Sequence, residues 1–291
     1  MFKGSFVAII TPFKNGNLDE ETLRKLVNFH IEQGTDGIVP CGTTGESATL
    51  SYEEHERVIQ IVVDEVNGRV PVIAGTGSNN TVEAIELTKA AKETGADGAL
   101  VITPYYNKPT QEGLYEHFKA IADSVNIPVV MYNVPGRTAV NMLPETVGKL
   151  AKLPNIVGIK DATASMQVLT EILLLTENEN FCLLSGDDFV YFPFLCCGGH
   201  GVISVVANIA PKITGDLYDN FAAGKYEEAK KLHFAVNELA KVMFLQTNPI
   251  PVKKAAALMG LVEDEIRLPL VSMEGEQVEI LKKALQKYNL L

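Results

Sequence analysis

The stretch EQGTDGIV, residues 32–39, recurs in altered form as ETGADGAL, residues 93–100. In both copies the end of a helix-like segment is followed by a glycine, an Asp-Gly pair and the start of an apolar, strand-like run. The two copies lie two strand–helix units apart, so the chain repeats a βα module of about 30 residues. Eight modules of this size occupy about 250 residues, which is the typical length of a closed (β/α)8 barrel.

Eight strand-like runs alternate with amphipathic helical segments along the chain. The runs are SFVAIITPF (5–13), DGIVPCG (36–42), PVIAGTG (71–77), GALVITP (98–104), PVVMYN (128–133), IVGIKDA (156–162), CLLSG (182–186) and GVISV (201–205). Most are apolar on both faces, which is typical of parallel strands covered by helices. A doubly wound open sheet is the alternative, but it usually carries a glycine-rich fingerprint after its first strand, where this chain has TPFKNGN.

We therefore predict an α/β fold, a (β/α)8 TIM barrel over residues 1–220. Three further helical patterns follow, at residues 226–244, 251–260 and 276–288. No linker composition separates them from the preceding modules, so we predict that residues 221–291 form a C-terminal helical region packed on the barrel.

The composition narrows the classes of partner. The chain has 25 basic and 36 acidic residues, a net charge of −11, which disfavours nucleic acid and anionic membranes as partners. The N-terminal segment lacks a secretory pattern and no later run approaches a membrane span, so we predict a cytoplasmic protein. The cysteines lack zinc spacing and are expected to be small buried hydrophobes, with neither a metal site nor a disulfide framework; they are Cys41, Cys182, Cys196 and Cys197.

One lysine interrupts an apolar run, NIVGIKDAT, at residue 160. Strict alternation would place Ile156 on the same face as Lys160, and Ile159 on the opposite face. Removing an unpaired ammonium from water costs several kcal/mol, and a buried lysine commonly responds by losing its proton. A neutral amine attacks a ketone or aldehyde and forms an imine, so the sequence predicts Lys160 as a nucleophile.

Other polar residues also follow the predicted strands, where the active sites of (β/α)8 barrels lie. The segments are CGTTGES (41–47), TPYYNKP (103–109), YNVPGRT (132–138) and SGDD (185–188). Glycines around the Thr43-Thr44 pair free backbone N–H groups to face a small anion. Tyrosine and threonine hydroxyls can transfer protons near the amine, and an arginine suits a substrate carboxylate. Together these groups indicate metal-free class I aldol chemistry that needs no cofactor.

These motifs resemble the dihydrodipicolinate synthase family of pyruvate-dependent aldolases over essentially the whole chain. The shared segments include GTTGESATL, TPYYNKPTQEG, YNVPGRT, GIKDAT, LLSGDD, GGHGVISV and NPIPVK, in the expected order. The resemblance implies that Lys160 forms the imine with pyruvate, and that Tyr132, Thr43 and Tyr106 relay protons, Tyr106 reaching across from a neighbouring subunit. It further implies that Thr43 and Thr44 hold the pyruvate carboxylate through their backbone, that Arg137 positions L-aspartate 4-semialdehyde, and that Gly186 and Ile203 line the pocket.

The same resemblance implies a homotetramer, a dimer of dimers, and a regulatory site for L-lysine. The matching positions for the regulatory site are Ser47, Ala48, His55, Asn79, Glu83 and Tyr105, while Tyr52 departs from the histidine of some members. Two alternatives stay open at this point. One is a sister aldolase acting on a 2-keto-3-deoxy sugar acid or 4-hydroxy-2-oxoglutarate, and the other is a catalytically silent barrel that binds a metabolite.

Overall fold

A computed structural model describes residues 2–291, which divide into two compact units. Among these residues, unit 1 comprises 2–4 and 73–203, and unit 2 comprises 5–72 and 204–291. The division does not coincide with our predicted boundary at residue 220, which describes the barrel and its appendage and stays a prediction.

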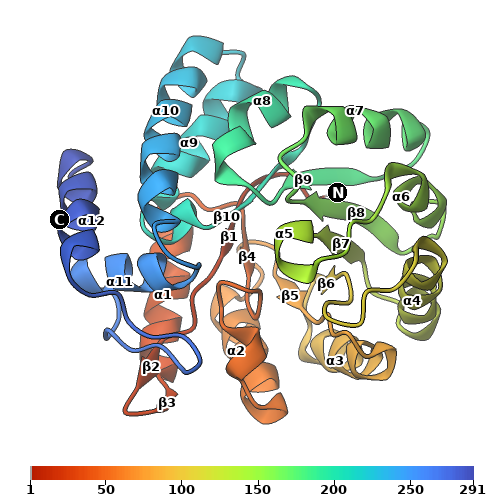
Figure 1. The fold of residues 1–291 in the computed structure, drawn as a ribbon, viewed down its shortest axis with the longest axis horizontal. Helices are drawn as coiled ribbons and strands as arrows, with labels where there is room; N and C mark the ends of the chain where they lie inside the picture. Colours follow the sequence, from red (N-terminus) through yellow and green to blue (C-terminus); the bar gives the residue numbers. More distant parts are fainter. Residues whose placement is uncertain (1) are drawn as a thin grey trace. The chain divides into compact units, whose positions relative to one another are not determined.

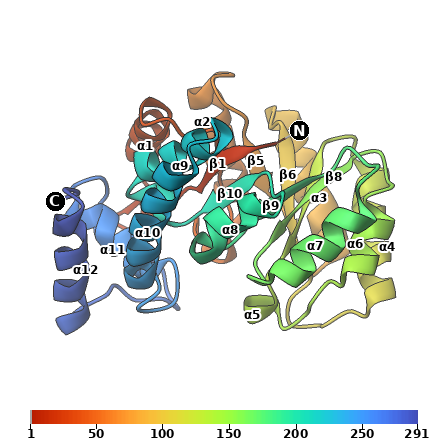
Figure 2. The same cartoon turned by 90° about the horizontal axis from the view of Figure 1, so that it is seen from above.

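Unit 1 alternates parallel strands with helices (Figure 1). Its elements are β5 (Ile73–Gly75), α3 (Thr81–Thr94), β6 (Gly98–Ile102), α4 (Gln111–Ser124), β7 (Val129–Asn133), α5 (Pro135–Thr138), α6 (Pro144–Leu150), β8 (Ile156–Asp161), α7 (Met166–Leu175), β9 (Cys182–Ser185), η2 (Asp188–Val190), α8 (Tyr191–Cys196) and β10 (Gly201–Ser204). The strands pair in the order β5-β6-β7-β8-β9-β10, so consecutive strands are neighbours. Figure 2 shows α4, α6 and α7 covering one face of this sheet.

Unit 2 contains the first strands and the C-terminal helices. Its elements are β1 (Gly4–Ala8), the two-residue strands β2 (Phe13–Lys14) and β3 (Asn17–Leu18), α1 (Glu20–Glu32), β4 (Gly37–Val39), η1 (Ser47–Thr49), α2 (Tyr52–Val66), η3 (Val206–Asn208), α9 (Pro211–Ala222), α10 (Tyr226–Met243), α11 (Ile250–Leu258) and α12 (Glu276–Lys287). Strands β1 and β4 pair in parallel, and β2 and β3 form an antiparallel hairpin that the sequence did not predict.

The predicted fold class is confirmed. The eight predicted strands are β1, β4, β5, β6, β7, β8, β9 and β10, all in parallel pairings and alternating with helices as in a (β/α)8 barrel. The three predicted C-terminal helices are α10, α11 and α12. Gly34 and Gly95, the helix-ending glycines of the repeated stretch, have φ of +84° and +95°, a backbone conformation that favours glycine.

Side-chain caps fix where several helices begin. Ser51 and Glu54 form a reciprocal capping box at the start of α2, with bonds of 3.2 Å and 3.0 Å to each other's backbone N–H. Asp19 and Thr110 accept from backbone N–H groups in the first turns of α1 and α4.

The main core of unit 1 lies between the sheet and its covering helices. It includes Phe118 of α4, Met131 of β7 and Ile159 of β8, each fully buried. Burying side chains of this size contributes about 1.5–3 kcal/mol each.

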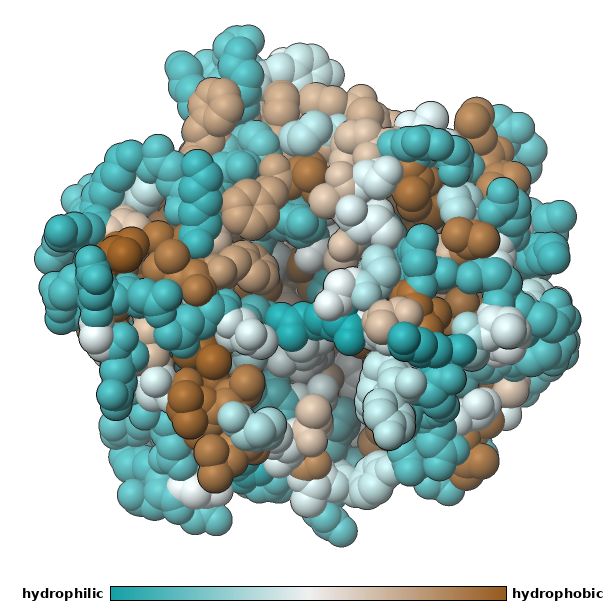
Figure 3. Space-filling view, viewed as in Figure 1, coloured by the Kyte–Doolittle hydropathy of each residue, from teal (hydrophilic) through white to brown (hydrophobic). Residues whose placement is uncertain are grey.

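Figure 3, the view of Figure 1 in space-filling form, shows hydrophilic residues around the edge of the face in view and apolar residues in several separate groups.

The prediction for the cysteines is only half right. Cys41 and Cys182 are buried, but Cys196 and Cys197 are exposed. Phe194 and Leu195 fill the buried side of the short helix α8, which leaves the two cysteines at its end facing solvent. Among residues 2–291, no helix has the length and hydropathy needed to cross a membrane; cytoplasmic localisation stays a prediction.

Candidate active site

Lys160 lies near the end of β8, directly opposite Tyr132 of β7. Both residues are buried, each with 7% of its surface exposed, and the lysine Nζ lies 4.2 Å from the centre of the tyrosine ring. Neighbouring residues on adjacent parallel strands hold this pair in place, so the amine and the aromatic ring meet without any flexible loop between them.

Burial lowers the pKa of the Lys160 amine to about 7, from an ordinary value of 10.5. The charge of Arg137 acts in the same direction, while the nearby carboxylate of Asp188 opposes it. At pH 7 about half of the amine is therefore neutral, compared with less than one part in a thousand for an exposed lysine. This is the property that a nucleophilic amine requires.

The strand that carries Lys160 is irregular. A register shift against β7 lies between Val129 and Val130, where Val129 pairs with Ile156 and Val130 with Gly158. Ile156 therefore belongs to the same helix-facing core as Ile159, and our expectation that it shares a face with Lys160 is wrong. Strict alternation fails because the bulge changes which side chains point to each face.

Asp161 shows how a second charged group is accommodated in this strand. Its carboxylate accepts hydrogen bonds from the amide of Asn133 at 3.2 Å and from the backbone N–H of Thr163 at 3.1 Å. Burial nonetheless raises its pKa. Asp161 therefore has local hydrogen-bond partners of its own.

Gly186, at the end of β9, makes room for the lysine side chain. A Cβ at this position would lie 3.0 Å from Cε of Lys160 and 2.8 Å from Cβ of Ala162. A side chain here would force Ala162 and the stem of Lys160 to shift, so the structure gives Gly186 a steric role in addition to the pocket-lining role implied by the resemblance. Ile203 is buried in β10, the neighbour of β9.

Arg137 and Asp188 influence the amine from two different short helices. Arg137 is exposed on the short helix α5, which Thr138 anchors through hydrogen bonds from its hydroxyl to the carbonyls of Val134 and Val140. Asp188 is buried at the start of η2. We did not single out Asp188 from the sequence; the adjacent acidic residues of SGDD, directly after a predicted strand, were the available signal.

Thr43 and Thr44 belong to unit 2, in a tight turn after β4. The backbone N–H of Gly45 donates to the carbonyl of Gly42 at 3.1 Å, and the backbone N–H of Glu46 donates to the carbonyl of Thr43 at 3.1 Å. Within residues 2–291 the backbone N–H groups of Thr43 and Thr44 have no recorded acceptor. Two adjacent unpaired N–H groups suit a small anion. That this turn meets Lys160 stays a prediction.

Tyr105 and Tyr106 follow β6 and differ in their surroundings. Tyr106 is 90% exposed and has a φ of +74°, a strained value for a residue with a side chain. Tyr105 accepts a hydrogen bond at its carbonyl from the amide of Asn79, at 3.1 Å. The structure thus brings together Tyr105 and Asn79 of the predicted regulatory set, while Tyr106 points into solvent in the single chain.

The other predicted regulatory residues lie in three places. Glu83 is in the first turn of α3, where Ser78 and Asn80 donate to its two carboxylate oxygens at 2.7 Å and 3.1 Å. In unit 2, Ser47 and Ala48 lie in η1 and His55 is buried in α2. Whether these groups form one binding site stays a prediction.

Comparison with known proteins gives consistent results. A model of the dihydrodipicolinate synthetase family matches residues 1–288. The 4-hydroxy-tetrahydrodipicolinate synthase of Geobacter sulfurreducens is 59% identical over 291 residues, covering 100% of both chains. A crystal structure of the chloride-inhibited dihydrodipicolinate synthase of Acinetobacter baumannii, complexed with pyruvate, is 49% identical with a TM-score of 0.97 and covers 100% of both chains. The lysine-bound enzyme of Cyanidioschyzon merolae is 40% identical with a TM-score of 0.96, covering 100% of this chain and 99% of its own.

Proposed function

Because the chain belongs to the dihydrodipicolinate synthetase family, we propose that it condenses pyruvate with L-aspartate 4-semialdehyde through an imine on Lys160. The product is 4-hydroxy-tetrahydrodipicolinate, an intermediate of lysine and diaminopimelate synthesis. Relatives that match the full length of the chain are named for this activity, which favours it over a sister aldolase and over a catalytically silent barrel. The observation that carries the proposal is the buried amine of Lys160 with its pKa near 7.

The chemistry follows from a neutral amine. The Lys160 nitrogen adds to the keto carbon of pyruvate, and loss of water gives an imine. The imine withdraws electrons from the adjacent methyl group, which loses a proton to give an enamine. The enamine carbon attacks the aldehyde of the second substrate, whose oxygen takes up a proton. The amino group of that substrate then attacks the imine carbon, which closes the ring and releases Lys160.

The proton transfers require a hydroxyl beside the amine. Tyr132 is the nearest candidate, since its ring lies against the Lys160 Nζ. We propose that Thr43 and Tyr106 extend this relay, with Tyr106 supplied by a second subunit. Its exposure in the single chain supports that assignment, and the active assembly we propose is a dimer of dimers.

The two substrate carboxylates need separate donors. We propose that the backbone N–H groups of Thr43 and Thr44 bind the pyruvate carboxylate, and that Arg137 binds the carboxylate of the semialdehyde. Gly186 and Ile203 shape the space around the imine. The exposure of Arg137 on α5 suits a group that meets the second, incoming substrate.

We also propose that L-lysine regulates the enzyme. The proposal rests on the set Ser47, Ala48, His55, Asn79, Glu83 and Tyr105, and it is supported by the lysine-bound relative from Cyanidioschyzon merolae. Asn79 donates a hydrogen bond to the carbonyl of Tyr105, and Tyr105 precedes Tyr106 in the chain. A ligand at these residues could thus disturb the proton relay. The coupling free energy between two sites in an allosteric protein is typically about 1–3 kcal/mol.

Trapping with borohydride tests the central step. Incubation with pyruvate and borohydride should add one reduced pyruvyl group to the peptide that contains Lys160, and Lys160→Met should abolish the addition. Label on another lysine would contradict the assignment. Consumption of L-aspartate 4-semialdehyde in the coupled assay, and its response to millimolar L-lysine, test the second substrate and the regulation.

A further inference from the structure

A buried ion pair joins the turn that carries Thr43 and Thr44 to the C-terminal helices of unit 2. The carboxylate Oε1 of Glu46 lies 2.5 Å from Nζ of Lys253 in α11, and its Oε2 accepts the backbone N–H of Arg267 at 3.1 Å. The side chains of Glu46 and Lys253 are 2% and 3% exposed. Both oxygens of Glu46 are therefore held by a part of the chain more than 200 residues away in sequence.

Glu46 itself stands in an unfavourable backbone conformation. Its φ is +55°, in the left-handed region that glycine and asparagine adopt more readily than glutamate. Cys41, at the other end of the same turn, has a φ of +54°. Strained residues of this kind persist only where surrounding contacts determine them, and the buried ion pair supplies such contacts at Glu46.

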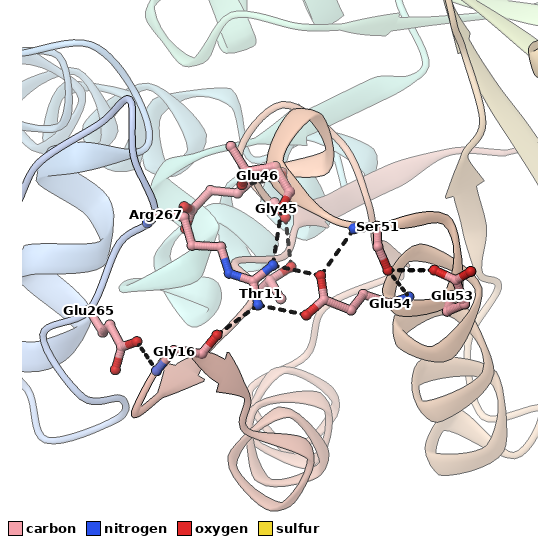
Figure 4. Close-up of polar contacts among 10 residues, drawn as sticks. Thr11, Gly16, Gly45, Glu46, Ser51, Glu53, Glu54, Glu265 and Arg267 are labelled. Carbon is pink, nitrogen blue, oxygen red and sulfur yellow. Dashed lines mark hydrogen bonds and ion pairs between the residues drawn. The ribbon is translucent and has the colours of Figure 1, made fainter.

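The partner region is itself firmly fixed (Figure 4). The guanidinium of Arg267 makes two hydrogen bonds of 2.6 Å to the carboxylate of Glu54, and it donates to the carbonyls of Thr49 and Gly16 at 3.0 Å each. The ring of Phe13 contacts two cations, its centre lying 4.3 Å from Nζ of Lys253 and 4.1 Å from Cζ of Arg267.

A second contact holds the turn from the same side. The amide of Asn248 donates to the hydroxyl of Thr44 at 3.0 Å, in a buried position. Asn248 and Lys253 are the first and last residues of the NPIPVK segment. This segment therefore contacts the turn at both Thr44 and Glu46, on the two sides of Gly45.

We infer that the Glu46–Lys253 pair is a positioning device that sets the backbone N–H groups of Thr43 and Thr44 for the carboxylate of an α-keto acid. The inference rests on the proposed function, because it concerns the pyruvate subsite. Neither residue touches substrate; they act through the turn. A misplacement of the two N–H groups weakens binding of pyruvate more than the later chemistry, since Lys160 lies in a different unit with its own supports.

The test compares three variants with the parent enzyme. Glu46→Gln keeps the shape and removes the charge, Lys253→Met keeps the stem and removes the ammonium, and the double variant removes both charges. Lys254→Met is the matched control, because this neighbouring lysine pairs with Asp264 instead of Glu46. The pyruvate concentration for half-maximal borohydride trapping is measured without the aldehyde, followed by KM for each substrate and kcat.

In all three variants, the pyruvate concentration for half-maximal trapping should rise on the order of tenfold or more. The KM for the aldehyde and kcat at saturating pyruvate should change about threefold or less, and Lys254→Met should match the parent. Single variants leave one buried charge unpaired and can lose stability, whereas the double variant leaves none. The double variant should therefore unfold at nearly the parent temperature and still bind pyruvate weakly.

The inference is overturned if the double variant folds and has the same half-saturating pyruvate concentration as the parent. It is also overturned if KM rises equally for both substrates. Failure of the double variant to fold also overturns it, because the pair would then be a requirement of the fold. No trapping in the parent enzyme would instead refute the proposed function, so the two failures are distinguishable.

Discussion

Replacing Lys160 by methionine should abolish activity and make the protein more stable at neutral pH. The folded state holds the amine at a pKa of about 7, whereas in the unfolded chain it returns to about 10.5. Below pH 7 the amine is protonated in both the folded and the unfolded state, so the folded state bears the full free-energy cost of burying the ammonium. Between pH 7 and about pH 10 the unfolded state binds more protons, so this cost falls as the pH rises. It amounts to about 4 kcal/mol at pH 7 and about 2 kcal/mol at pH 9.

Methionine is an unbranched side chain only one atom shorter than lysine and has no charge to bury, so Lys160→Met should recover much of this free energy. Equilibrium unfolding in urea at equal protein concentration, at pH 7 and pH 9, measures the difference between variant and parent. The stability advantage of the variant should shrink by about 2 kcal/mol across this interval.

Lys254→Met is the control for that experiment. Its ammonium pairs with Asp264 near the surface, so its effect on stability should depend little on pH. An advantage of Lys160→Met that stays constant from pH 7 to pH 9, or that grows, would show that the amine is not neutral in the folded protein.

Four further results are expected. Gly186→Ala should lower turnover on the order of a hundredfold, because its Cβ would lie 3.0 Å from Cε of Lys160; unchanged steady-state kinetics would contradict the steric role. Tyr132→Phe keeps the ring beside the amine but lacks the hydroxyl, so borohydride trapping should persist while turnover falls about a hundredfold or more; loss of trapping would instead indicate a structural role. Arg137→Lys should slow the use of the aldehyde and leave imine formation largely intact, since lysine does not reproduce a bidentate contact; equal loss of both steps would argue against this role. The rate of imine formation should rise with pH through about 7 and then level off, following the neutral amine of Lys160; a stopped-flow profile with no inflection between about pH 6 and pH 8 would count against that pKa.

The sequence by itself determined the order of strands and helices, because the signals for this order are local. The glycines of EQGTDGIV and ETGADGAL stop helices through their own backbone freedom, and apolar runs of five to nine residues mark the strands. It also identified Lys160, since an amine inside an apolar strand is chemically conspicuous wherever the strand is placed. The hairpin of β2 and β3 was missed, although its turn is Asn15-Gly16, the residue pair that two-residue hairpin turns favour, with φ of +53° and +81°.

The tertiary structure alone decided which residues share a face and which charges meet. Periodicity places Ile156 beside Lys160, but a bulge against β7 turns it into the helix-facing core. The exposure of Cys196 depends on how α8 packs, which its sequence does not state. Glu46 reads as an ordinary loop carboxylate until Lys253, 207 residues later, is found against it. Pairings at such separations depend on the energy of the whole folded chain, in which the cost of burying a charge is offset by a partner that no local pattern reveals.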